Sequence, residues 1–148
     1  RVVIQRVLSA AVEIGGEEVA AIGRGLLLFL AVAPGDEDSH SQWVIDKILN
    51  MRIFDGADGF MSRSLKEMGG EILVVSQFTL YANLRKGRRP SFSEAAPPME
   101  ALAVYQRFVE LLRLIWPPTQ TGVFGADMRV TLENDGPVTL ILDYPQSD

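Results

Sequence analysis

A long amphipathic helix is the feature that most restricts how this chain can fold. Between the proline pairs at 97–98 and 117–118, apolar side chains recur at alternating steps of three and four residues. They are Leu102, Tyr105, Val109, Leu112 and Trp116. This spacing predicts an α-helix with one apolar face, beginning at the first proline pair and ending at the second. Because that face must be buried, the remaining chain has to supply a layer to cover it.

The rest of the chain is patterned mainly as strands. A second helix is expected over about 42–53, capped by Ser39 or Ser41, and Gly15-Gly16 marks a hairpin turn. The stretches with strand character are 2–7, 12–14, 18–22, 26–32, 71–80, 119–125, 128–134 and 138–144. The pattern predicts an α+β fold, with a barrel-like, mostly antiparallel sheet that carries two main helices. With 148 residues and no linker or repeat, we expect one domain over 1–148.

The residue inventory narrows the chemistry. The chain has no cysteine, which excludes disulfides and thiolate nucleophiles, and its only histidine is His40. His40 precedes the expected helix, where a solvated helix-cap residue is the ordinary interpretation. The turn at 55–59 resembles a calcium loop, but the position that requires Glu holds Lys66. We therefore expect neither a metal nor a cofactor.

Charge and hydropathy bear on location and partners. No apolar run approaches the roughly 20 residues of a membrane span, and no signal-like segment is present, so we expect a cytoplasmic protein without a membrane partner. The net charge of −5 argues against a general nucleic-acid coat protein. However, four basic residues cluster at Arg85, Lys86, Arg88 and Arg89. They form either a solvated loop or a local phosphate clamp.

The strand expected over 71–80 ends in hydrogen-bonding side chains. Ser76, Gln77 and Thr79 stand where a buried strand would carry more Val and Ile. Alternation along a strand places Gln77 and Thr79 on one face, and predicts Phe78 on the other as a core anchor. A Thr hydroxyl is a poor nucleophile without a neighbouring base. The polar end is either the edge of a sheet or the wall of a ligand site.

A second unusual spot follows Asn134. The Asp135-Gly136 pair is a hairpin signal, yet Pro137 comes directly after it. A Gly-Pro peptide bond adopts the cis form more easily than other peptide bonds do. The segment is therefore either a plain turn or a rigid wedge of backbone.

These two spots resemble the signature motifs of the D-aminoacyl-tRNA deacylases, also called D-tyrosyl-tRNA deacylases. The motifs here are SQFTL at 76–80 and NDGPVT at 134–139. The segments IQRV, RIFDG, GG.ILVVSQFTL, KG.RPSFS and TQTG.F.ADM.V.L.NDGPVT match that family in order. The resemblance extends over nearly the whole chain. Its departures are small: Gly125 stands where Ala is more usual, and the tail after 143 runs slightly past the family's last strand.

The resemblance implies a homodimeric, barrel-like enzyme of translation quality control. Its expected reaction is hydrolysis of the ester that joins a D-amino acid, or glycine, to tRNA, while L-aminoacyl-tRNA is rejected. The basic cluster at 85–89 is then expected to bind the tRNA. The implied catalytic pocket comprises Ser76, Gln77, Phe78 and Thr79, and the chiral screen that acts in the partner subunit comprises Gly136 and Pro137.

Several alternatives stay open. In one mechanism the ribose 2′-hydroxyl of the tRNA activates a water, and main-chain N–H groups near Phe78 and Thr79 hold the oxyanion. In the other, Thr79 is the nucleophile. The alternative function is a non-catalytic module that binds RNA or a nucleotide in the same pocket. We also expect the Gly136-Pro137 bond to be cis, with its carbonyls facing the substrate.

Overall fold

The computed structural model describes residues 1–145, and a long first strand organises its sheet. Strand β1 (Val2–Ile14) pairs antiparallel with β2 (Glu17–Ile22) through its second half and with β3 (Gly25–Leu30) through its first half. Gly15 and Gly16 connect β1 to β2 with positive φ angles of 57° and 83°, as a tight hairpin turn requires. The predicted hairpin is confirmed.

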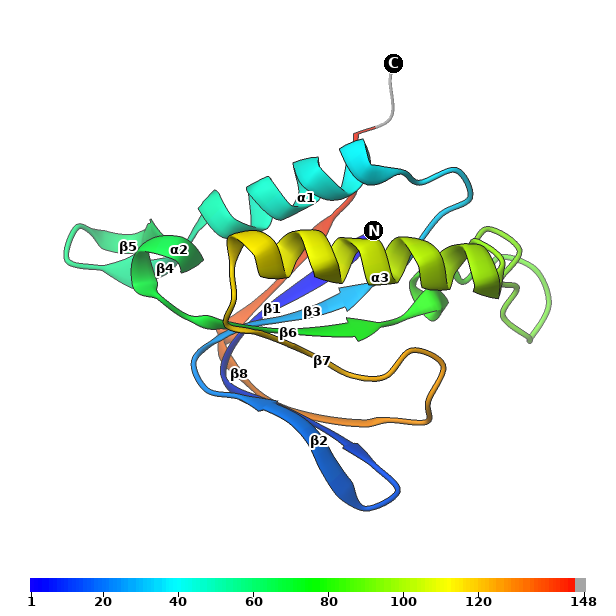
Figure 1. Ribbon diagram of the computed structural model, residues 1–148, viewed down its shortest axis with the longest axis horizontal. Helices are drawn as coiled ribbons and strands as arrows, with labels where there is room; N and C mark the ends of the chain where they lie inside the picture. Colours follow the sequence, from blue (N-terminus) through cyan, green and yellow to red (C-terminus); the bar gives the residue numbers. More distant parts are fainter. Residues whose placement is uncertain (146–148) are drawn as a thin grey trace.

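Three strands on one side of the sheet run parallel to each other. Strand β6 (Glu71–Ser76) lies parallel to β3, and the short β7 (Thr119–Thr121) lies parallel to β6. Strand β8 (Arg129–Leu142) runs antiparallel along the other edge of β1. The resulting sheet curves strongly (Figure 1). The predicted α+β, barrel-like fold is confirmed, with the parallel pairs β3–β6 and β6–β7 at one side of the sheet.

Two helices cover one face of the sheet. Helices α1 (Asp38–Asn50) and α3 (Pro98–Ile115) lie along each other on that face (Figure 1). The main core fills the space beneath them and includes Leu28, Ile48 and Leu112. A second apolar cluster, which contains Val7 and Leu73, lies on the opposite, concave face. The predicted helix between the proline pairs is therefore confirmed with its buried face.

The remaining elements lie at one end of the helical layer. Strands β4 (Arg52–Gly56) and β5 (Gly59–Ser64) form a hairpin that projects from the body, and the short helix α2 (Leu65–Met68) returns the chain to β6 (Figure 1). None of the helices within residues 1–145 is long and apolar enough to cross a membrane.

Three predicted boundaries are wrong for local reasons. Helix α1 begins earlier than expected because the main-chain N–H of Glu37 donates to Nδ1 of His40 at 3.3 Å and closes the first turn there. It also ends earlier, since Ile53 is buried in β4 rather than in the helix. The strand expected over 119–125 stops at Thr121.

The largest correction concerns the segment 128–144. It was expected as two strands joined by a turn, but it is one strand, β8, with an interruption. Along β1, Gln5 pairs with Thr139 and Val7 pairs with Asn134. Four residues of β8, 135–138, therefore stand opposite Arg6 alone. The Gly-Pro motif is a bulge in a continuous strand, not the tip of a hairpin.

Candidate functional site

The strand end at Ser76 turns immediately into a short helix. The N–H of Gln77 extends the β3–β6 ladder by one hydrogen bond, to the carbonyl of Leu30 at 2.8 Å. The chain then enters a 3₁₀ turn, η1 (Phe78–Tyr81), in place of the strand that was expected through residue 80. The main-chain N–H groups of Phe78 and Thr79 have no acceptor among residues 1–145. Two free donors therefore open this turn, as is usual where a helix begins.

The polar side chains of this turn contact each other. The amide of Gln77 donates a hydrogen bond to Oγ1 of Thr79. No carboxylate or imidazole of the described chain hydrogen-bonds to that hydroxyl. Because a Gln amide cannot take a proton, this contact orients Thr79 without activating it as a nucleophile.

The prediction that Phe78 anchors the core is wrong. Its side chain is 56% exposed, because the strand has already ended and the alternation of faces no longer applies. The ring instead packs edge-to-face on Phe92, with ring centroids 5.1 Å apart and an angle of 74° between the planes. Thr79 is exposed as well, so residues 76–79, called the SQFT segment below, lie on an open surface of this chain.

The bulge in β8 presents Gly136 and Pro137 outward. Both residues are exposed, the peptide bond between them is cis, and Gly136 has a φ of 125° that favours glycine. The side chain of Asn134 closes the base of the bulge: its Oδ1 accepts from the N–H of Val138 at 3.1 Å, and its Nδ2 donates to Oγ1 of Thr139 at 3.0 Å.

Arg6 supports this bulge from within. Its side chain is almost fully buried, and it donates to the carbonyl of Asp135 at 3.1 Å and to that of Ile53 at 2.8 Å. The carboxylate of Asp135 lies 3.4 Å from its Nε, which balances the buried charge. Arg6 thus ties the Gly-Pro bulge to β4.

Sequence analysis did not identify Arg6 as a site residue, although a signal was present. Val2 and Ile4 are buried on the inward face of β1, and Arg6 is the next residue with the same parity. A cation at an inward position of a strand calls for buried partners.

The two motifs do not meet within one chain. Strands β8 and β6 are separated by β1 and β3, which is three inter-strand steps or about 14 Å along the sheet. No hydrogen bond of the described chain joins 76–79 to 134–139. A site that uses both motifs requires a second subunit.

The basic cluster lies directly after η1. Its loop is closed by paired main-chain hydrogen bonds between Asn83 and Ser91, at 2.7 and 3.0 Å. All four cations are exposed, and none forms an ion pair within residues 1–145. They are Arg85, Lys86, Arg88 and Arg89.

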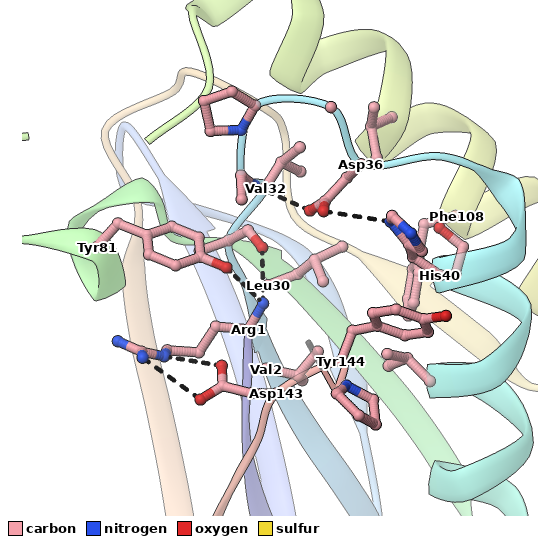
Figure 2. A pocket seen from close by; sticks show the side chains of 18 residues that line it. Arg1, Val2, Leu30, Val32, Asp36, His40, Tyr81, Phe108, Asp143 and Tyr144 are labelled. Carbon is pink, nitrogen blue, oxygen red and sulfur yellow. Dashed lines mark hydrogen bonds and ion pairs between the residues drawn. The ribbon is translucent and has the colours of Figure 1, made fainter. Parts of the chain in front are cut away.

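A separate pocket of about 790 Å³ lies between α1, α3 and the end of β8. Figure 2 shows His40, Tyr144 and Tyr81 around it, with the imidazole of His40 stacked 4.2 Å from the Tyr144 ring. Burial raises the pKa of Tyr81. None of the four SQFT residues lines this pocket. His40 caps α1 as predicted, but its imidazole is half-buried against Tyr144 instead of being solvated, and it lines a pocket that contains none of the SQFT residues.

Comparison with known proteins identifies a family that matches nearly the whole chain. The family described as D-Tyr-tRNA(Tyr) deacylase matches residues 3–143. A protein of Thermomicrobium roseum named D-aminoacyl-tRNA deacylase is 53% identical, over 97% of this chain and 93% of its own length. One of Chlorobaculum parvum with the same name is 52% identical, over 99% of both chains.

Solved structures share the fold. The c-Myc DNA unwinding element binding protein superposes with a TM-score of 0.92 at 40% identity, over 98% of this chain and 99% of the other. A probable eukaryotic D-amino acid tRNA deacylase superposes with a TM-score of 0.81 at 19% identity, over 94% and 96%. At that identity the second likeness concerns the fold alone.

Proposed function

This chain belongs to the D-Tyr-tRNA(Tyr) deacylase family, and on that premise we propose that it hydrolyses the ester of D-aminoacyl-tRNA. The products are a free D-amino acid and a reusable tRNA. The observation that carries the proposal is the sequence identity of 53% and 52% to two relatives named D-aminoacyl-tRNA deacylase, over nearly the full chain. Since the substrate is aminoacyl-tRNA, the enzyme acts where translation occurs, in the cytoplasm.

The proposed mechanism takes its base from the substrate. The chain has no cysteine, His40 lies in another pocket, and Thr79 is bonded to an amide that cannot accept a proton. The ribose 2′-hydroxyl therefore directs a water onto the carbonyl carbon. The free N–H groups of Phe78 and Thr79 hold the oxyanion. The attacking water gives a proton to the oxygen of the 2′-hydroxyl while that hydroxyl passes its own proton to the 3′ oxygen. The bond between the carbonyl carbon and the 3′ oxygen then breaks. Thr79 as nucleophile is the competing mechanism.

The proposed enzyme is a homodimer with sites shared between subunits. Two observations support this: the motifs lie far apart in one chain, and β8 has one edge that pairs with no strand of residues 1–145. Near its end, β8 exposes Leu140 and Ile141, the latter by 69%. In the proposed two-fold dimer, Gly136 and Pro137 of each subunit enter the site that holds the SQFT segment of the other.

The Gly-Pro bulge is the proposed chiral screen. A D- and an L-amino acid differ in the direction in which the side chain leaves the α-carbon. Backbone held by Arg6 and Asn134 is stiff enough to fill the space that an L side chain needs. Such a screen rejects by steric clash, so glycyl-tRNA passes it and is a substrate.

The four free cations at 85–89 are the proposed contact with tRNA phosphates. They are unpaired within residues 1–145 and follow η1 directly, which places positive charge beside the SQFT surface of an otherwise acidic protein.

A second candidate function is binding of nucleic acid without catalysis. It is favoured by one of the similar solved structures, which is named c-Myc DNA unwinding element binding protein. The same surface and basic loop would serve it.

One assay separates the two functions. D-tyrosyl-, L-tyrosyl- and glycyl-tRNA are incubated with the protein, and release of the amino acid is followed. The proposal expects turnover of the D-tyrosyl and glycyl esters and none of the L-tyrosyl ester. Tight binding of all three without release would support the second function.

A further inference from the structure

The aromatic ring of Phe92 packs against the exposed ring of Phe78. Phe92 follows directly after Ser91, whose paired hydrogen bonds with Asn83 return the basic loop to the end of η1. This return brings Phe92 edge-to-face onto Phe78, at a centroid distance of 5.1 Å. Both rings are partly exposed, by 38% for Phe92 and 56% for Phe78.

Arg1 holds the C-terminal end of η1: its Nη1 donates to the carbonyl of Leu80, and its N-terminal amino group donates to the hydroxyl of Tyr81, both at 3.0 Å. The end that Phe78 begins is held less firmly. Helix η1 has four residues, none of them buried, and no side chain caps its N-terminus. Its cap residue Gln77 has φ −148° and ψ 75°, outside the regular regions. A short, exposed turn of this kind opens easily unless a tertiary contact holds it. The Phe78–Phe92 pair is that contact at its N-terminal end, where the two free N–H groups lie.

We propose that Phe92 is a positioning residue for the deacylation reaction. Its ring fixes the ring of Phe78 and thereby the direction of the main-chain N–H groups of Phe78 and Thr79. Phe92 itself contacts neither the ester nor the oxyanion. This inference rests on the proposed function, in which those N–H groups stabilise the transition state.

The test is a double-mutant cycle with Phe92→Ala, Phe78→Ala and the double variant, in single-turnover cleavage of D-tyrosyl-tRNA. Phe92→Ala should lower the rate at saturating enzyme about three- to tenfold, the range that aromatic pairs contribute, with little change in the affinity for substrate. In the Phe78→Ala background the same change should cost nothing further. Phe92→Tyr, which keeps the ring, should retain the rate.

Phe60→Ala is the matched control. Phe60 is 77% exposed in β5, outside the site, so this variant should behave as the wild type. Additive losses from Phe78→Ala and Phe92→Ala would overturn the proposal. Weaker substrate binding at an unchanged rate would also overturn it, because Phe92 would then be a contact for the tRNA.

A second readout does not depend on activity. In ¹H–¹⁵N spectra of the free protein, Phe92→Ala should shift the amide signals of Phe78 and Thr79, and Phe92→Tyr should restore most of the shift. Unmoved amides would overturn the positioning role. If the protein cleaves no D-aminoacyl-tRNA but the amides shift, the proposed function fails while the structural coupling holds.

Discussion

Gly136 and Arg6 show how single residues determine the shape of the candidate screen. Four residues of β8 face Arg6 alone, and the guanidinium fills the space behind the bulge. A Cβ built on Gly136 would lie 3.0 Å from Nη2 of Arg6 and 3.0 Å from Cγ2 of Val138. With a φ of 125°, this position accepts glycine and little else.

Gly136→Ala should therefore reduce cleavage of D-tyrosyl-tRNA by at least about tenfold and destabilise the fold by about 1–3 kcal/mol, since its backbone is strained for any L residue. Single-turnover assays and denaturant unfolding measure the two effects. Gly125→Ala is a control at another positive-φ glycine, and should lose stability but keep activity. Full activity in Gly136→Ala would remove this residue from the site.

Substitution of Thr79 distinguishes the mechanism assisted by the 2′-hydroxyl from the one in which Thr79 is the nucleophile. If the 2′-hydroxyl of the substrate directs the water, Thr79→Ala should keep measurable deacylation, with a loss of about tenfold from the altered position of Gln77. A substrate with a 2′-deoxy terminal adenosine should be cleaved far more slowly by the wild type. An inactive Thr79→Ala variant together with normal cleavage of the 2′-deoxy substrate would establish Thr79 as the nucleophile.

At the scale of elements, sequence patterns predicted what repeats and missed what breaks a repeat. The apolar stripe of α3 and the Gly15-Gly16 hairpin were predicted because a fixed period or a known turn pair specifies them. The end of β6 at Ser76 was missed because the main-chain partners of Gln77 and Leu80 set it, and no periodicity carries that information. The β8 bulge was read as a hairpin turn for the same reason.

The basic loop at residues 85–89 can be tested by reversing its charges. Reversing Arg85, Lys86, Arg88 and Arg89 to Glu should weaken tRNA binding strongly without unfolding the protein, since all four are exposed and unpaired within residues 1–145. The affinity of the wild-type protein for tRNA should fall as the salt concentration rises. The variant should show a smaller slope of log affinity against log salt concentration, because its binding releases fewer counterions from the phosphates. Reversal of Lys47 and Lys66, two lysines elsewhere on the chain, is the control. Equal affinity and slope in the loop variant would show that the loop is only solvated.

For the whole molecule, the sequence predicted the fold class but could not assemble the site. The first motif was predicted as the polar end of a strand and the second as a turn or a rigid wedge of backbone. Their relation in space depends on the strand order β8–β1–β3–β6, which local patterns do not encode. The structure separates them within one chain. We therefore propose that an active site needs the SQFT segment of one subunit and the Gly-Pro bulge of another.

Subunit complementation tests that claim most directly. Gln77→Ala removes the contact that orients Thr79, and Gly136→Val disrupts the bulge, so each variant alone should have little activity. In a mixed dimer one site carries both defects, while the other combines an intact SQFT segment with an intact bulge. Co-expressed and purified mixed dimers should regain about half of the wild-type rate on D-tyrosyl-tRNA, because one of two sites is whole. Mixed dimers as inactive as the two parents, or a protein that sediments as a fully active monomer, would contradict the shared site.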